Sequence, residues 1–210
     1  MVSVKEMPFK EKYDEILRYM EVTEGFAIPL VKEELGKAKA NELRDLWKKE
    51  SKPIPEGASD KDRYEIAYRN FMRNWVSAHN FMRENMGWYG AKKFLTAAIA
   101  GWQRKYSSDA LLLKIVGSVS RKAAFRTLAE SLAYKLQVFS PFIVSELDEN
   151  HMILKVNPCK IPEMPEGLDF CSMACQNIIP VWLSKQFNIK MNPTRHGADC
   201  TVIFERFKSG

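Results

Sequence analysis

The residue pattern of this chain changes once, near residue 138, and that change limits the folds the chain can adopt. Up to residue 135, apolar side chains recur at helical spacing, as in Phe9, Tyr13 and Ile16. Beyond residue 138, short apolar and β-branched runs flank polar turns, a pattern typical of hairpins. The sequence therefore predicts an α+β fold with a helical part at 1–135. A small antiparallel sheet crossed by one helix is expected at 136–210, in one continuous domain with the helices.

The boundaries of the expected elements follow from periodicity and from turn residues. Gly25 and Pro29 predict a kink or break in the first helix, Ser59 predicts an N-cap, and Gly87 with Gly90 predicts a turn. Helices are expected at 9–35, 37–50, 60–86, 91–105, 119–134 and 168–187, and strands at 142–147, 151–156, 188–192 and 198–207.

The charge pattern narrows the classes of partner. The chain carries 32 basic and 26 acidic residues, a formal net charge of +6, with the two signs interspersed. No recognition helix or arginine-rich arm indicates a nucleic-acid partner. The chain has no apolar signal region, and its longest apolar run, Phe94 to Trp102, is too short to span a bilayer. We expect a cytoplasmic protein with no nucleic-acid or membrane partner. Its apolar helical part is compatible with a homodimer.

Four cysteines gather in the C-terminal part, at positions 159, 171, 175 and 200. Cys171 and Cys175 share one face of a predicted helix, Cys159 precedes that helix, and Cys200 begins the last strand. In a sheet crossed by this helix, the four side chains can converge. In the reducing cytoplasm, such cysteines indicate thiols, a metal site or catalysis before structural disulfides.

Three interpretations of these cysteines remain open. In the first, all four bind zinc or iron, with His196 as a further ligand, although their spacing is not that of a zinc finger or ribbon. In the second, Cys171 is a catalytic thiol whose pKa is lowered near a helix N-terminus, and His196 is its acid or base partner. In the third, the cysteines fill the core, as free cysteines often do.

Three further side chains are candidates for ligand contact. His79 and Trp75 lie on the aromatic-rich helix expected at 60–86, which predicts either a well-packed helical core or an apolar pocket for a small molecule. Arg195 precedes His196 and suits a bidentate contact with a carboxylate.

Three stretches of the C-terminal part resemble a known family. Asn157-Pro158-Cys159, Phe170 to Cys175 and Pro193 to Phe204 are similar to the C-terminal half of the L-2-amino-thiazoline-4-carboxylic acid hydrolase family. That family has a Cys-Pro-like loop, a Cys-x-x-x-Cys helix start and a terminal Gly-x-x-Cys-x-Phe strand. A broader likeness is to the 4-vinyl reductase (V4R) domain, an α+β domain that binds small molecules.

The resemblance implies hydrolysis of a C–N or thiazoline-type bond in an amino-acid-like substrate. It suggests Cys171, Cys175 and His196 as catalytic residues and Arg195 as the carboxylate anchor. The V4R likeness implies an alternative, a non-enzymatic domain that binds a small molecule, a metal or a cofactor.

Overall fold

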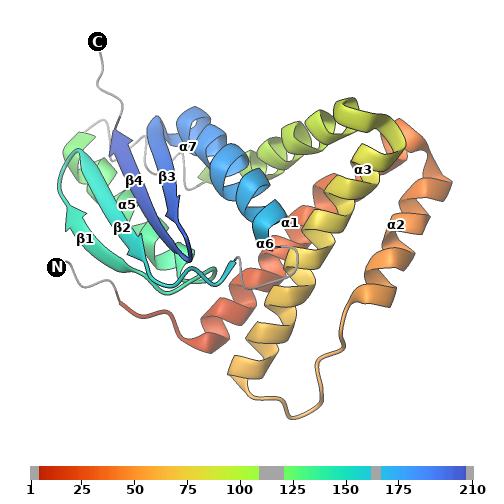
Figure 1. Cartoon of the computed structure of the whole chain (residues 1–210), viewed down its shortest axis with the longest axis horizontal. Helices are drawn as coiled ribbons and strands as arrows, with labels where there is room; N and C mark the ends of the chain where they lie inside the picture. Colours follow the sequence, from red (N-terminus) through yellow and green to blue (C-terminus); the bar gives the residue numbers. More distant parts are fainter. Residues whose placement is uncertain (1–4, 109–120, 162–166, 207–210) are drawn as a thin grey trace. The chain divides into compact units, whose positions relative to one another are not determined.

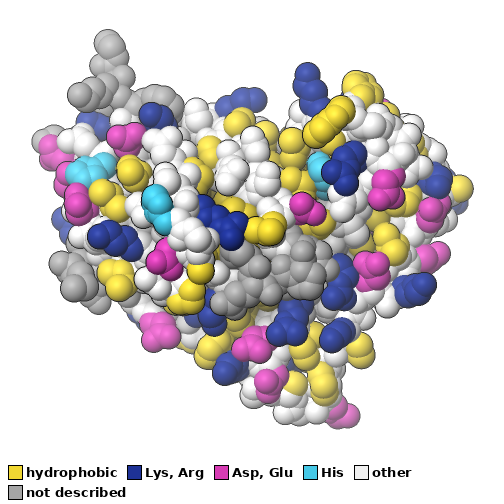
Figure 2. Space-filling view, viewed as in Figure 1, with side chains coloured by type: hydrophobic (Ala, Val, Ile, Leu, Met, Phe, Trp, Pro, Cys, Tyr) yellow, Lys and Arg dark blue, Asp and Glu magenta, His cyan; other side chains and the backbone are white. Residues whose placement is uncertain are grey.

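The computed structural model describes residues 5–108, 121–161 and 167–206 and confirms the expected α+β fold (Figure 1). The chain divides into two compact units. One is Pro8–Trp102, and the other is Met1–Met7 together with Gln103–Gly210. No helix within the described ranges is both long enough and apolar enough to cross a membrane. Basic and acidic side chains are interspersed over the face drawn in Figure 2, in keeping with the mixed charge pattern of the sequence.

The helical unit begins with α1 (Phe9–Leu35) and α2 (Lys37–Glu50), which pack against each other. Both helices have the predicted bounds, but the expected break in α1 is wrong, because the helix continues through Gly25 and Pro29. Packing stabilises this stretch enough to offset the missing N–H of the proline. The buried residues around it are Phe26, Ala27, Ile28, Leu30 and Val31.

The third helix, α3 (Asp60–Lys105), is interrupted at the predicted place. Ser59 caps its start, because the Asp62 N–H donates a hydrogen bond of 3.2 Å to the Ser59 hydroxyl. Gly87 has φ 63° and ψ −149°, a backbone conformation that is essentially restricted to glycine. A Cβ atom on Gly90 would clash with the Met82 carbonyl oxygen, so this turn also needs its second glycine.

The second unit contains a four-stranded antiparallel sheet in the order β1-β2-β4-β3. Its strands are β1 (Ile143–Leu147), β2 (His151–Val156), β3 (Ile189–His196) and β4 (Asp199–Arg206). Alternate residues are buried along each of the central strands, so one face of the sheet carries the core of the unit. The buried residues of that face are Val144, Met152, Leu154, Val156, Ile189, Met191, Val202 and Phe204.

A continuous helical segment packs against this sheet, and α7 lies alongside β3 (Figure 1). The segment consists of α6 (Gly167–Phe170), a π-helix η2 (Cys171–Ile178) and α7 (Ile179–Phe187). It ends at Asn188, which adopts the left-handed conformation typical of a helix C-terminus. The predicted helical segment is confirmed, with a difference of one residue at its start. Helix α5 (Arg121–Leu136) precedes the sheet, and the predicted helical residues before Arg121 lie outside the described ranges.

Strand β3 is longer than the sequence suggested. It was expected to end at residue 192, but pairing with β4 continues through Pro193 to His196. Proline is tolerated because β3 is an edge strand and needs no N–H donor on its outer side. The two strands are joined by the short Gly197–Ala198 turn, in which Gly197 has φ 64°.

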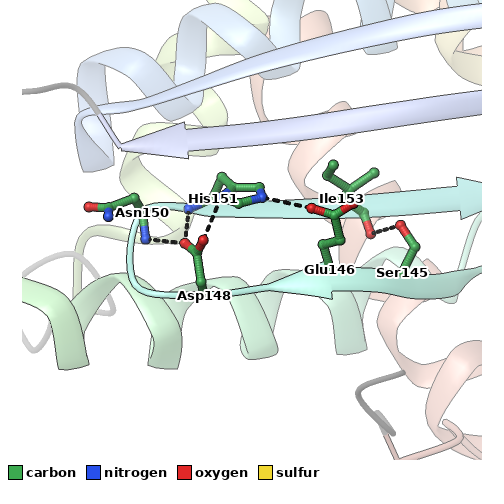
Figure 3. Close-up of polar contacts among 6 residues, drawn as sticks. All are labelled: Ser145, Glu146, Asp148, Asn150, His151 and Ile153. Atoms are coloured by element: carbon green, nitrogen blue, oxygen red, sulfur yellow. Dashed lines mark hydrogen bonds and ion pairs between the residues drawn. The ribbon is translucent and has the colours of Figure 1, made fainter.

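The β1–β2 hairpin is closed by a polar network (Figure 3). One Asp148 carboxylate oxygen accepts the N–H groups of Asn150 and His151, at 2.6 and 2.8 Å. The His151 ring contacts Asp148 at 2.7 Å and Glu146 at 3.1 Å. The hydrogen bond to Glu146 is the first cause that raises the pKa of His151 above its ordinary value, and the Asn150 N–H is the first that lowers the pKa of Asp148.

Replacing Gly87 with alanine tests the backbone constraint in α3. We expect Gly87→Ala to lower the free energy of unfolding by about 1–3 kcal/mol, because alanine disfavours this conformation. Gly25→Ala is the matched control, since Gly25 is helical, exposed and has open space around it. It should raise stability by about 0.5–1 kcal/mol. Urea unfolding measures both values, and equal effects would contradict this view of Gly87.

The His151 network predicts a pH-dependent contribution to stability. Folding raises the pKa of His151. The contribution of the charged His151 pairs to the free energy of unfolding is therefore fully present below the pKa of His151 in the unfolded chain. It is lost as pH rises through the pKa of His151 in the folded protein. The Tm difference between wild type and His151→Asn should therefore be larger near about pH 5.5 than near about pH 8.5. Asp148 stays ionised over this range, since its pKa is lowered. A difference that is constant with pH would refute the network's role.

Candidate functional site

A cavity of about 70 Å³ lies in the sheet unit, between the buried face of the sheet and η2. Such a volume is several times what one water molecule needs. Most of its wall is apolar. Strands β2, β3 and β4 contribute Leu154, Val156, Met191 and Val202, and the helical segment contributes Phe170 and Ile179. An apolar cavity with a few polar groups is the usual form of a small-molecule site.

The β3–β4 register decides which polar side chains reach this cavity. Arg195 pairs with Cys200, and both line the cavity together with Pro193 and Val202. His196 pairs with Asp199 one position further along, at the end of the hairpin. Because side chains alternate between the two faces of a sheet, Arg195 and His196 point in opposite directions. Arg195 is the one charged basic side chain among the described residues of the cavity wall.

All four cysteines line the cavity. Cys159 follows a cis Asn157–Pro158 peptide bond, and its N–H donates to the Ala198 carbonyl oxygen at 2.8 Å. The Ser140 hydroxyl donates to the Cys159 sulfur at 3.8 Å. The Cys200 thiol donates to the Thr201 carbonyl oxygen, also at 3.8 Å. The four cysteines therefore share one cavity wall, but no group of three or more of them forms a cluster in the described part of the chain.

Cys171 and Cys175 come from η2, whose widened turns differ from the α-helix that the sequence suggested. The Ile179 N–H donates to the Ala174 carbonyl oxygen, five residues earlier, which is the hydrogen bond of a π-helix. Pro180 supplies the cause. Its ring would clash with the carbonyl four residues before it in a regular helix, so the preceding turns widen. The Asn177 amide occupies one such turn and donates to the Ser172 carbonyl oxygen at 2.6 Å.

The electrostatics of the two η2 thiols differ sharply. The Cys175 thiol donates a hydrogen bond to the Cys171 sulfur, and this bond, helped by the charge of Arg195, lowers the pKa of Cys171 to about 6. The same bond and burial raise the pKa of Cys175 well above its ordinary value. At neutral pH, Cys171 is therefore mostly a thiolate and Cys175 a thiol that stabilises it. Burial, followed by the Cys159 and Cys171 sulfurs, raises the pKa of Cys200 to about 11.

The lowered pKa of Cys171 has a different origin from the predicted one. Cys171 was expected near a helix N-terminus, but the described helix begins at Gly167, one turn earlier. The field of a helix terminus falls off within the first turn. The Cys175 hydrogen bond and the Arg195 charge take its place.

The metal interpretation finds no site in the described part of the chain. There, no group of three or more His, Cys, Asp or Glu side chains is arranged to hold a metal ion. The four cysteines proposed as ligands for zinc or iron share a cavity wall, but their arrangement is not one of metal coordination.

Three other predicted site residues are not among the residues of this cavity wall. His196 is an exposed residue at the end of the β3–β4 hairpin. Trp75 and His79 belong to the helical unit, and neither lines the cavity. Trp75 is 1% exposed and packs edge-on against Phe26 and Phe94, each at 5.5 Å between ring centroids. His79 is buried edge-on against Phe94 at 5.6 Å. These two side chains belong to the core of the helical unit.

Several wall residues were not predicted from the sequence. The Ser140 hydroxyl makes two hydrogen bonds, because it donates to the Cys159 sulfur and accepts the Lys160 N–H at 2.8 Å. Phe139 contacts Phe170 at 5.9 Å between ring centroids. No local motif marks these positions. In contrast, Pro180 inside an expected helix was a signal that could have predicted the irregular turns before it.

Comparison of this chain with protein-family models, with curated proteins and with solved structures gives no match. The resemblance to the thiazoline hydrolase and V4R families therefore stays a prediction.

The two η2 thiols generate a prediction about reactivity. Alkylation by iodoacetamide should show one fast cysteine, Cys171, with an apparent pKa near 6. Cys175→Ala removes the hydrogen-bond donor, so the pKa of Cys171 should rise and its rate at pH 7 should fall by about tenfold or more. Cys200→Ser is the matched control and should leave the fast rate unchanged. Peptide mass spectrometry assigns the alkylated residue. A fast residue other than Cys171 would contradict this account.

Proposed function

We propose that this chain binds a small, mostly apolar molecule that carries a carboxylate or a similar anionic group. The observation that carries this proposal is an apolar cavity whose wall holds one arginine, Arg195. An apolar wall favours a hydrocarbon body, and a guanidinium group favours a planar anion. This is the small-molecule-binding function that the V4R likeness suggested.

Arg195 is suited to this role because part of its guanidinium group is already held in place. Its Nε–H donates to the Gly197 carbonyl oxygen at 2.7 Å, within the β3–β4 turn. That contact restrains the side chain of Arg195, which also lines the cavity. A restrained arginine loses less conformational entropy when it binds a carboxylate.

Ligand binding and the state of Cys171 are coupled in this proposal. The positive charge of Arg195 helps to lower the pKa of Cys171. A carboxylate that pairs with Arg195 neutralises that charge, so it raises the pKa of Cys171 while also covering the thiol. A bound anion therefore lowers the reactivity of Cys171 both by raising its pKa and by covering it. A neutral ligand lowers the reactivity only by covering the thiol.

Matched ligands test this function. Hexanoate should bind more tightly than 1-hexanol by isothermal titration calorimetry, and hexanoate should slow the alkylation of Cys171. Arg195→Gln should weaken hexanoate binding about tenfold, since a charged hydrogen-bonded pair contributes about 1.5–3 kcal/mol. It should change 1-hexanol binding little.

Lys155→Gln is the control variant for this test. Lys155 is exposed on β2, and it pairs with Thr201, which is absent from the cavity wall. The variant removes the same charge from the same sheet and should bind hexanoate like wild type. Equal losses in both variants would show a general charge effect and would refute the role of Arg195.

A second function, thiol-dependent hydrolysis, is favoured by the Cys171 thiolate in the same wall. A substrate carboxylate at Arg195 would place a small heterocycle beside this nucleophile. In a thiazoline, the thiolate would add to the ring carbon between nitrogen and sulfur, and the ring C–S bond would break. Cys175, a thiol with a raised pKa, would protonate the departing sulfur. Water would then hydrolyse the thio-linked intermediate and release Cys171. His196 has no part in this scheme, because it is not among the residues that line the cavity.

Incubation with 2-aminothiazoline-4-carboxylate tests this second function. Ring opening frees a new thiol, which a colorimetric thiol reagent detects after the protein is removed. We expect Cys171→Ser to abolish release, and His196→Gln to retain most of it. Release that survives Cys171→Ser, or that is lost only in His196→Gln, would rule out the thiolate mechanism.

A further inference from the structure

Cys171 and Cys175 form a thiolate–thiol pair that small-molecule binding alone does not need. Both lie in η2, both line the cavity, and both are partly exposed. The two residues are four apart in this helical segment, so their side chains lie on one side of it, along the same cavity wall. A reactive thiolate beside a second thiol is the arrangement found at redox-active cysteines.

The surrounding groups separate this pair from the other two cysteines. Cys159 accepts a hydrogen bond from Ser140, and Cys200 donates one to the Thr201 carbonyl oxygen. Both contacts are 3.8 Å long. Each of these sulfurs therefore has a partner outside the pair. Arg195 faces Cys171 from β3 and is the cationic group that stabilises its thiolate.

We propose that Cys171 and Cys175 are a redox-active dithiol that reduces small organic hydroperoxides entering the apolar cavity. The cavity determines the substrate class, because its wall is apolar apart from the thiols, Arg195, Ser140 and Gln176. An alkyl hydroperoxide combines an apolar body with an O–O bond that a thiolate can attack. Arg195 is placed to donate hydrogen bonds to the oxygen that departs. This activity goes beyond carboxylate binding and does not depend on it.

The reaction balances in two steps. The Cys171 thiolate attacks the terminal oxygen of ROOH, the O–O bond breaks, and the products are a Cys171 sulfenic acid and an alkoxide, which takes up a proton to become ROH. The Cys175 thiol then attacks the Cys171 sulfur, which forms the disulfide and releases water with the Cys175 proton. The hydroperoxide is reduced by two electrons, which the two thiols supply. A dithiol reductant such as dithiothreitol restores the pair.

The π-helical turn is compatible with disulfide formation. Residues four apart on a helix have Cβ atoms about 5–6 Å apart, whereas a disulfide needs about 3.8 Å. Closure therefore requires a local contraction of η2. A π-helical turn is a rare arrangement, and it adjoins Pro180, which cannot donate a backbone hydrogen bond. Contraction here disturbs fewer regular helical hydrogen bonds than it would in an α-helix.

Tryptic mapping distinguishes the pairings clearly. Cleavage after Lys160 and Lys185 leaves Cys171 and Cys175 in one peptide, whereas Cys159 and Cys200 fall in two others. After treatment of the reduced full chain with tert-butyl hydroperoxide, we expect the 161–185 peptide to lose the mass of two hydrogen atoms. In Cys175→Ala, dimedone should label Cys171 instead. In Cys200→Ala, the matched control, the 161–185 disulfide should still form.

The rate comparison tests the substrate class. The rate ratio of tert-butyl hydroperoxide to hydrogen peroxide should exceed the same ratio for free glutathione by about tenfold or more, because the apolar wall favours the alkyl group. A ratio equal to that of glutathione overturns the assignment to organic hydroperoxides. Absence of oxidation, or a disulfide that joins the peptides of Cys159 and Cys200, overturns the dithiol assignment. Hexanoate binding is measured independently, so either proposal can fail alone.

Discussion

The antiparallel pairing of β3 with β4 is the constraint on which the candidate site depends. This pairing, closed by the Gly197–Ala198 turn, places Arg195 opposite Cys200 on the cavity face. A shift of one residue would move both side chains to the other face and bring His196 inward. Apolar residues on the same strands, including Met191 and Val202, oppose such a shift because it would expose them to water.

In a cavity with a mostly apolar wall, single contacts change the pKa of a thiol strongly. Burial alone disfavours a thiolate, as Cys200 illustrates, since its pKa is raised to about 11. Cys171 differs because it has a hydrogen-bond donor in Cys175 and a nearby cation in Arg195. Two cysteines of one cavity therefore have opposite pKa shifts. The contrast arises from their partners, because both cysteines are partly buried.

Much of the fold could be predicted from local pattern, because helical periodicity and hairpin turns are encoded by neighbouring residues. The bounds of α2 and β2, the Ser59 cap and the interruption at Gly87 were predictable for this reason. The length of β3 was not, since tolerance of Pro193 depends on the strand lying at the sheet edge. The continuity of α1 through Pro29 was not predictable either, because it depends on burial of the surrounding residues.

The candidate site was predictable in its members but only partly in their roles. The four cysteines and Arg195 were identified from spacing and chemistry, and they do line one cavity. The roles assigned to His196 and His79 depended on which way each side chain points, which periodicity alone does not determine. The effect of Cys175 on the pKa of Cys171 could not be predicted from the sequence either, since it depends on the wide turns of η2.

The central claim is that the β3–β4 register directs Arg195, and not His196, toward the thiols. Titration of protein labelled with carbon-13 at the cysteine Cβ atoms, followed by NMR, reports the pKa of each thiol separately. Arg195→Gln should raise the pKa values of both Cys171 and Cys200, because the Arg195 charge lowers each of them. His196→Gln should change neither. Shifts caused by His196→Gln, with none in Arg195→Gln, would contradict the register and the site built on it.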